Sequence, residues 1–126
     1  MEKQHLVFVY GTLRQGHSNH QLMGAAHCHG IGLTREKYAM YIVSGYPYVT
    51  SAETRYPIVG ELYAVDNEML EKLDKVEGHP HFYVRREVVV NVEGREFSAW
   101  MYLRDPPGML LPTGDFNDVA GEVRPS

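Results

Sequence analysis

The residue in this sequence best placed to do chemistry is Glu77, a carboxylate at the end of a predicted helix. Around a helix that turns about 100° per residue, with Leu70 at zero, Glu77 lies at about 340° and Leu73 at about 300°, so the acid lies on the apolar face. Burial disfavours the carboxylate anion, and the negative end of the helix dipole disfavours it further. A carboxyl group whose pKa is raised towards neutrality suits a general base. The alternative is that Glu77 ends the helix and turns into solvent, as most glutamates do.

The second candidate is the turn Tyr10-Gly11-Thr12-Leu13, which follows a predicted buried strand. A strand that ends at a glycine presents consecutive backbone N–H groups, and such donors hold a carboxylate or a developing oxyanion. Gly11 would let a ligand approach the main chain closely. Thr12 offers a hydroxyl, and Tyr10 a ring with a polar tip. Taken alone, the turn is better explained as an ordinary strand-to-loop connection, so its significance depends on its pairing with Glu77.

The seven histidines raise the question of a metal site. Two pairs are close in sequence, His17 with His20 and His27 with His29. Neither pair has the i, i+4 spacing of ligands on one helix face, and Cys28 has no second cysteine as a partner. Surface histidines are the better explanation, so the sequence predicts no metal site and no cofactor.

Composition and charge indicate one domain over residues 1–126, with 44% hydrophobic residues available for its core. The net charge of -4 argues against nucleic acid as a partner, because phosphate binding needs a basic stripe. A single cysteine fits a reducing compartment. We expect no signal peptide and no membrane segment, so the predicted location is the cytoplasm. The sequence leaves the oligomeric state open.

The elements that must position Glu77 and the turn follow from hydrophobic periodicity and from turn residues. Leu6–Tyr10 is predicted as a strand buried on both faces, and Asn67–Glu77 as a helix that Asp66 caps and Gly78 ends. Further strands are predicted over Tyr38–Val43, Ile58–Val65, Phe82–Val92 and Glu96–Leu103, the last two joined as a hairpin by Glu93-Gly94.

The remaining stretches carry weaker signals. Ser18 and Gly24 would bound a brief helix over Asn19–Met23. The aromatic stretch Tyr38–Tyr48 is expected to form core and barrel wall rather than a ligand site. Residues 105–126 contain few apolar side chains and are predicted as a loosely packed tail. Roughly five to seven strands and one helix indicate an α+β fold whose sheet closes or half-closes.

Three blocks of the sequence resemble the γ-glutamyl cyclotransferase-like family. Val7–Arg14 resembles its N-terminal signature, and Gly60–Val65 resembles its second block. Leu73–Gly78, followed by Tyr83 and Arg85, resembles the block that carries the family's catalytic glutamate. The short length is similar to the γ-glutamylamine cyclotransferase branch. The resemblance implies a small mixed β-barrel with flanking helices.

The resemblance also implies a cyclisation of a small γ-glutamyl substrate. The substrate's α-amine attacks its own side-chain carbonyl, 5-oxoproline forms and a free amine leaves, with Glu77 as general acid and base. The substrate would lie on the Tyr10–Leu13 turn, with Tyr83 lining the same pocket. Another γ-glutamyl compound, such as a γ-glutamyl amino acid or a glutathione-like peptide, is the alternative within the enzyme class. Outside that class, the alternatives are a non-catalytic module that binds a small carboxylate and an interaction protein that has lost the chemistry.

Overall fold

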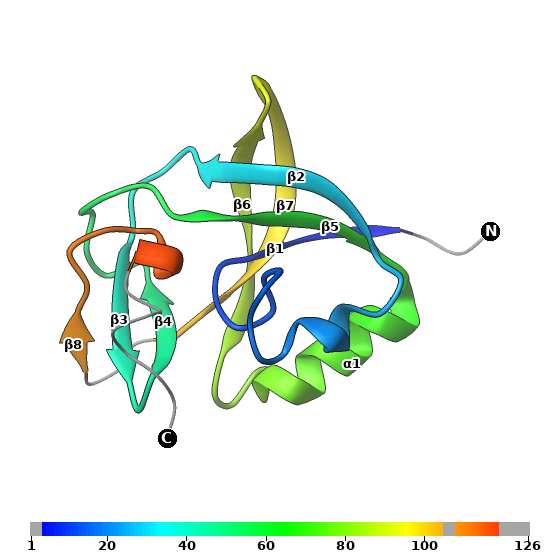
Figure 1. Ribbon diagram of the computed structural model, residues 1–126, viewed down its shortest axis with the longest axis horizontal. Coiled ribbons are helices and arrows are strands. Elements are labelled where there is room, and N and C mark those ends of the chain that lie inside the picture. Colours follow the sequence, from blue (N-terminus) through cyan, green and yellow to red (C-terminus); the bar gives the residue numbers. More distant parts are fainter. Residues whose placement is uncertain (1–3, 105–107, 119–126) are drawn as a thin grey trace.

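The computed structural model describes residues 4–104 and 108–118, and its centre is a closed barrel of five strands (Figure 1). In barrel order the strands are β1 (His5–Val9), β5 (Val59–Val65), β2 (His27–Thr34), β6 (Val84–Val92) and β7 (Arg95–Leu103). Neighbouring strands are antiparallel except β1 and β7, which run parallel and close the barrel where Val7 lies opposite Trp100. The predicted small mixed barrel of an α+β fold is therefore confirmed.

Alternating side chains along β1 serve two separate cores. Phe8 packs with Leu62 in a cluster shared by the barrel strands and a second sheet. Val7 and Val9 pack on the opposite face, in a cluster with Leu73 of the helix. All five of these side chains are at most 4% exposed. The strand is buried on both faces, as the sequence predicted, and it carries the turn at its end into the interior of the protein.

The second sheet has three strands in the order β4-β3-β8, namely β4 (Tyr46–Thr50), β3 (Ala39–Val43) and β8 (Met109–Leu110). It lies beside one end of the barrel (Figure 1). The turn between β3 and β4 is Ser44-Gly45, and both residues have positive φ angles, 53° and 83°. That combination gives the tight twist of a two-residue hairpin. The sequence predicted a strand over Tyr38–Val43, which is β3, but it predicted no strand over Tyr46–Thr50.

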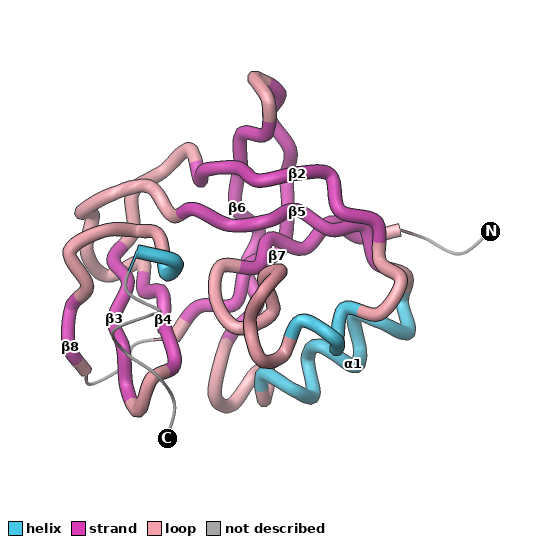
Figure 2. Tube along the Cα trace, in the orientation of Figure 1, coloured by secondary structure: helices cyan, strands magenta, loops and turns pink. Residues whose placement is uncertain are grey.

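The single α-helix among the described residues, α1 (Asn67–Glu77), runs along the outside of the barrel (Figure 2). The Asp66 side chain accepts a hydrogen bond of 2.8 Å from the Met69 N–H and so caps the first turn. Gly78 ends the helix in the left-handed conformation, with φ of 68°. Both ends agree with the prediction. No helix in the described part of the chain is long and apolar enough to cross a bilayer.

Two local features differ from the prediction. The brief helix is a 3-10 helix, η1 (His20–Met23); it begins after Asn19 rather than Ser18, and no side chain caps it. Strand β2 was not predicted at all, although it contributes one wall of the barrel. The sequence signal for β2 is weak because the strand contains two glycines and alternates irregularly between polar and apolar residues.

The prediction of a loosely packed tail is wrong for residues 108–118. Leu111 and Phe116 are only 3% and 2% exposed. The Leu111 N–H donates to the Met40 carbonyl at 2.8 Å, which continues the pairing of β8 with β3. A second 3-10 helix, η2 (Phe116–Asp118), follows. Residues 105–107 and 119–126 of the predicted tail lie outside the described residues.

Phe116→Ala should lower the free energy of unfolding by about 3–5 kcal/mol, because it removes a buried aromatic side chain from the core. Met109→Ala is the matched control from the same segment, since Met109 is 60% exposed, and it should change the stability by less than about 0.5 kcal/mol. Urea unfolding of both variants measures the difference. Equal, small losses would contradict the packing of this segment.

Candidate active site

A cavity of about 280 Å³ opens between the barrel, the end of α1 and the second sheet. Its walls come from the end of β1 and the following turn, the start of β4, the last residues of α1 and the region where β7 ends. All the site residues predicted from the sequence line it, namely Glu77, Tyr83 and the turn Tyr10–Leu13. The fold therefore brings the carboxyl group and the turn to one cavity, while their chemical roles remain predictions.

Glu77 is the last residue of α1 and is half-buried in the cavity wall. No group among the described residues donates a hydrogen bond to its carboxylate. Burial raises the pKa of Glu77 to about 7. Burial also raises the pKa of the neighbouring Tyr83, and the negative charge of Glu77 raises it further. Glu77 is thus a carboxyl group that gains and loses a proton near neutral pH.

Asp74, one helical turn before Glu77, attaches the end of α1 to the barrel. Arg85 of β6 donates to both Asp74 oxygens, from Nε at 2.9 Å and from Nη2 at 3.0 Å. The Tyr102 hydroxyl of β7 donates to the same carboxylate at 2.7 Å. The Arg85 guanidinium also stacks on the Trp100 ring, 4.3 Å from its centroid. These contacts fix the last turn of the helix, and with it the position of Glu77.

Two tyrosines that line the cavity use their hydroxyl groups in hydrogen bonds to the main chain. The Tyr10 hydroxyl donates to the Tyr102 carbonyl at 2.7 Å, and the Tyr83 hydroxyl donates to the Pro47 carbonyl at 3.2 Å. The Tyr83 ring also packs edge-on against Tyr48, with 5.5 Å between centroids. These two tyrosines therefore offer a ligand mainly their rings, while their hydroxyl groups hold β1 and β4 in place.

The Tyr10–Leu13 turn leaves its N–H groups available. The Gly11 carbonyl accepts from the Arg14 N–H, and the Thr12 carbonyl accepts from the Asn19 N–H, each at 3.0 Å. Within residues 4–104 and 108–118, the N–H groups of Gly11, Thr12 and Leu13 have no acceptor. A ligand anion in the cavity can therefore receive these bonds without displacing a protein group.

Position 11 requires a glycine because of its contact with Pro47. A Cβ atom at residue 11 would lie 2.6 Å from the Pro47 Cγ, well inside van der Waals contact. The close approach of the turn to β4 thus sets the width of the cavity at this point.

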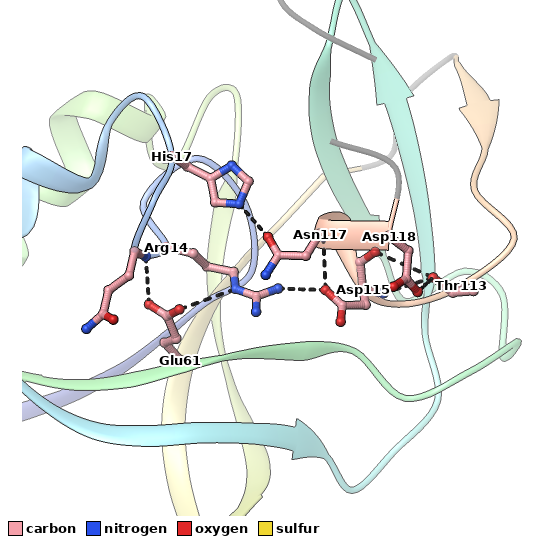
Figure 3. Close-up of polar contacts among 8 residues, drawn as sticks. Arg14, His17, Glu61, Thr113, Asp115, Asn117 and Asp118 are labelled. Atoms are coloured by element: carbon pink, nitrogen blue, oxygen red, sulfur yellow. Dashed lines mark hydrogen bonds and ion pairs between the residues drawn. The ribbon is translucent and has the colours of Figure 1, made fainter. Parts of the chain in front are cut away.

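Arg14 anchors the far side of the turn (Figure 3). Its side chain is only 2% exposed; Nη1 donates to Asp115 at 2.8 Å, and Nε lies 3.5 Å from Glu61 of β5. Glu61 also accepts from the Gln15 N–H at 3.0 Å and from the Tyr63 hydroxyl at 2.9 Å. A buried cation between two carboxylates thus ties the turn to the barrel and to the segment before η2.

Residues 7–118 match the family described as gamma-glutamyl cyclotransferase, AIG2-like. The chain belongs to this family. It is 43% identical over 118 residues to a provisionally named gamma-glutamylcyclotransferase of Methanocaldococcus jannaschii, a match that covers 91% of this chain and 98% of that one. The gamma-glutamylaminecyclotransferase of Rattus norvegicus is 36% identical over 94 residues, which are 68% of this chain and 63% of the rat protein.

A solved structure agrees with this assignment. The crystal structure of an AIG2-like protein of Mus musculus matches with a TM-score of 0.72 and 31% identity, covering 79% of this chain and 76% of that one. The family resemblance found in the sequence is therefore confirmed. The protein is an enzyme of the gamma-glutamyl cyclotransferase class.

Several residues that line the cavity of this cyclotransferase were not predicted as site residues, among them two tyrosines and an arginine. Tyr46 and Tyr48 were expected in the core and barrel wall, but they line the cavity from β4. Arg104 follows β7 and lines the same cavity. The packing of the second sheet against the end of the barrel brings Tyr46 and Tyr48 to the site, and no local pattern in the sequence encodes that contact.

The histidines make ordinary contacts. His27 and His29 pack ring against ring with 4.7 Å between centroids, and the His20 Nδ1 lies 2.9 Å from the Leu13 carbonyl. His17 is hydrogen-bonded to Asn117. Among the described residues, no group of three His, Cys, Asp or Glu side chains is arranged to hold a metal ion.

Arg14→Met should lower the free energy of unfolding by about 3–5 kcal/mol, because it leaves two carboxylates, one of them buried, without their cation. Arg55→Met is the matched control. Arg55 pairs with Glu53 at 2.9 Å, but its side chain is 51% exposed, so its loss should cost about 0–1 kcal/mol. Chemical denaturation of the two variants gives both numbers. If Arg14→Met is as mild as Arg55→Met, the buried ion pair does not anchor the turn.

Proposed function

We propose that the chain is a γ-glutamyl cyclotransferase that acts on a γ-glutamylamine or a related γ-glutamyl compound, with Glu77 as general acid and base. The observation that carries the proposal is the presence in one cavity of a carboxyl group with a pKa of about 7 and a turn with unused N–H groups. A carboxyl group that titrates near neutral pH accepts and returns protons under ordinary cellular conditions.

In the first step the α-amine of the γ-glutamyl group attacks its own side-chain carbonyl carbon. The new C–N bond closes a five-membered ring, and Glu77 takes the proton that the amine loses. The carbonyl oxygen becomes an oxyanion, which the N–H groups of Gly11, Thr12 and Leu13 stabilise. The nucleophile belongs to the substrate, so the enzyme supplies position and proton transfer rather than a covalent intermediate.

In the second step the tetrahedral intermediate collapses. The original amide C–N bond breaks, the carbonyl re-forms, and the protonated Glu77 returns its proton to the departing amine. The products are 5-oxoproline and a free amine. One carboxyl group thus serves both half-reactions, and it ends the cycle in its starting state. No water, oxidant or cofactor enters the atom balance.

The environment of Glu77 favours catalysis over simple binding. Pure binding of an anionic ligand gains nothing from a half-buried carboxylate in the wall of its cavity, because like charges repel. A proton acceptor, by contrast, benefits from the same burial, since its pKa then lies close to the working pH.

Glu77→Gln should reduce 5-oxoproline release from a panel of γ-glutamyl compounds by at least about 100-fold, because the amide cannot take up the amine proton. Glu71→Gln on the exposed face of α1 is the matched control and should retain wild-type release. Release that survives in Glu77→Gln would keep the enzyme class but refute the role of Glu77. If the folded wild type releases nothing from any compound yet binds them, the module that binds a small carboxylate is favoured instead.

The pH dependence of kcat/KM gives an independent test. The base acts in its ionised form, and with a pKa of about 7 only half of the molecules carry that form at about pH 7. At pH 5 only about one molecule in a hundred carries ionised Glu77, so the rate should lie about 100-fold below its plateau. An acid limb at or below pH 4.5, the ordinary pKa of a glutamate, would show that burial does not tune this group.

A further inference from the structure

Asn19 lines the cavity, but the proposed mechanism gives it no role. It lies immediately before the 3-10 helix η1, at the position where an asparagine side chain usually caps the first turn. No such cap forms here. The Asn19 Nδ2 instead donates a hydrogen bond of 2.9 Å to the hydroxyl oxygen of Thr12, which lies 7 residues earlier in the chain. The side chain is thus directed at the cavity turn rather than at its own helix.

The main chain of Asn19 contacts the same residue. Its N–H donates to the Thr12 carbonyl at 3.0 Å. In a trans peptide the C=O and N–H bonds point to opposite sides, so the bond that holds the Thr12 carbonyl also directs the Leu13 N–H. That N–H has no acceptor among the described residues. Asn19 therefore holds Thr12 at two points, one on the main chain and one on the side chain.

His20 continues these contacts by one residue. Its Nδ1 lies 2.9 Å from the Leu13 carbonyl oxygen. Because a carbonyl oxygen only accepts hydrogen bonds, Nδ1 carries the hydrogen in this contact. The carbonyl oxygens of Thr12 and Leu13 are thus both occupied by protein donors from residues 19 and 20. The turn keeps its donors for a ligand, while its acceptors are already in use.

The direction of the Asn19–Thr12 bond determines what the Thr12 hydroxyl offers to a ligand. A hydroxyl group has one hydrogen and two acceptor lone pairs. Nδ2 occupies a lone pair, so the hydrogen remains available, and no group within residues 4–104 and 108–118 accepts it. Accepting one hydrogen bond also strengthens the hydroxyl as a donor, because linked hydrogen bonds polarise each other. Since Thr12 lines the cavity, a ligand there can receive this hydrogen.

We propose that Asn19 is a positioning residue that makes the Thr12 hydroxyl a hydrogen-bond donor to an anionic oxygen of the ligand. The proposal rests on the proposed function of the same cavity. A γ-glutamyl compound has two groups with such an oxygen, the α-carboxylate before the reaction and the oxyanion during it. Asn19 acts on either of them through Thr12.

Asn19→Asp tests the direction of the bond, because a carboxylate of nearly the same shape accepts hydrogen bonds and donates none. The Thr12 hydroxyl would then give its hydrogen to the new carboxylate and present a lone pair to the ligand. The variant should weaken the binding of γ-glutamylethylamide, or lower kcat for it, by about 10- to 100-fold, the size of a hydrogen bond to a charged group.

Ser18→Asp is the matched control. It adds the same charge one residue earlier, at an exposed position outside the cavity. Solvent and salt screen a charge at such a position, so Kd and kcat should stay within about twofold of their wild-type values. A loss as large as that of Asn19→Asp would assign the effect to charge and overturn the inference.

A double-mutant cycle with Thr12→Val decides whether Asn19 acts through the hydroxyl. Thr12→Val removes the hydroxyl and keeps the branched shape of the side chain. On that background Asn19→Asp should lose most of its effect, a coupling of about tenfold or more. Thr12→Ser restores a hydroxyl and should restore the sensitivity to Asn19→Asp. An effect that persists in Thr12→Val would mean that Asn19 contacts the ligand itself or repels it as Asp, and would overturn the inference.

Two measurements assign the anionic oxygen. Calorimetry on the Glu77→Gln background measures binding without turnover. Coupling in Kd for γ-glutamylethylamide, absent for 4-aminobutyrylethylamide, which lacks the α-carboxylate, assigns the hydroxyl to that carboxylate. Coupling in kcat alone, measured with Glu77 in place, assigns it to the oxyanion. Thermal unfolding shows that each variant is folded.

The outcomes also separate this inference from the proposed function. Coupling in Kd supports the role of Asn19 even where no compound is turned over, and a wild type that binds without releasing 5-oxoproline refutes the proposed function alone. Equal coupling in Kd for both amides overturns the inference, since the hydroxyl would then serve a part of the ligand without charge. Folded variants that show no coupling in either Kd or kcat overturn it as well.

Discussion

The position of the site depends on the hydrogen bonds that the carboxylate of Asp74 accepts. They come from Arg85 of β6 and from Tyr102 of β7, and so fix the last turn of α1 to two barrel strands. Burial alone would raise the pKa of Asp74, but the hydrogen bonds from Arg85 and Tyr102 outweigh it and lower that pKa. The Tyr102 carbonyl in turn accepts from Tyr10, so the same set of contacts reaches the end of β1. The helix end and the turn are thereby held in one frame.

Asp74 and Glu77 show how one short segment gives two carboxyl groups opposite properties. Asp74 is paired with the nearby guanidinium of Arg85 and stays ionised. Glu77 is half-buried and forms no ion pair with any described residue, and burial raises its pKa to about 7. If Arg85 faced Glu77 instead, Glu77 would be held in its ionised form, and it would return a proton poorly in the proposed reaction. The contrast between the lowered pKa of Asp74 and the raised pKa of Glu77 therefore depends on which of the two carboxyl groups Arg85 contacts.

Local signals were sufficient for the parts of the fold that nearby residues encode. Asp66 and Gly78 mark both ends of α1, and Glu93-Gly94 marks the β6–β7 hairpin, where both φ angles are positive. Strand β2 lacks such signals, since Gly32 is required by a distant neighbour; a Cβ there would lie 2.5 Å from the Asn91 carbonyl oxygen. For the site, Glu77 could be predicted because a carboxylate on the apolar face of a helix is unfavourable for stability and therefore indicates a functional role. The burial of Phe116 in the predicted tail depends on tertiary contacts, which the sequence leaves unspecified.

The cavity lies at a seam between two sheets that share no strand. The acid and the N–H turn belong to the barrel side, whereas Tyr46, Pro47 and Tyr48 face them from β4. The ring of hydrogen bonds that closes the barrel does not pass through β4. Substitutions in this opposing wall can therefore change the size and polarity of the cavity while Glu77 and the turn keep their positions. In the proposed reaction, the groups that react and the wall that would select among substrates therefore belong to different sheets of the fold.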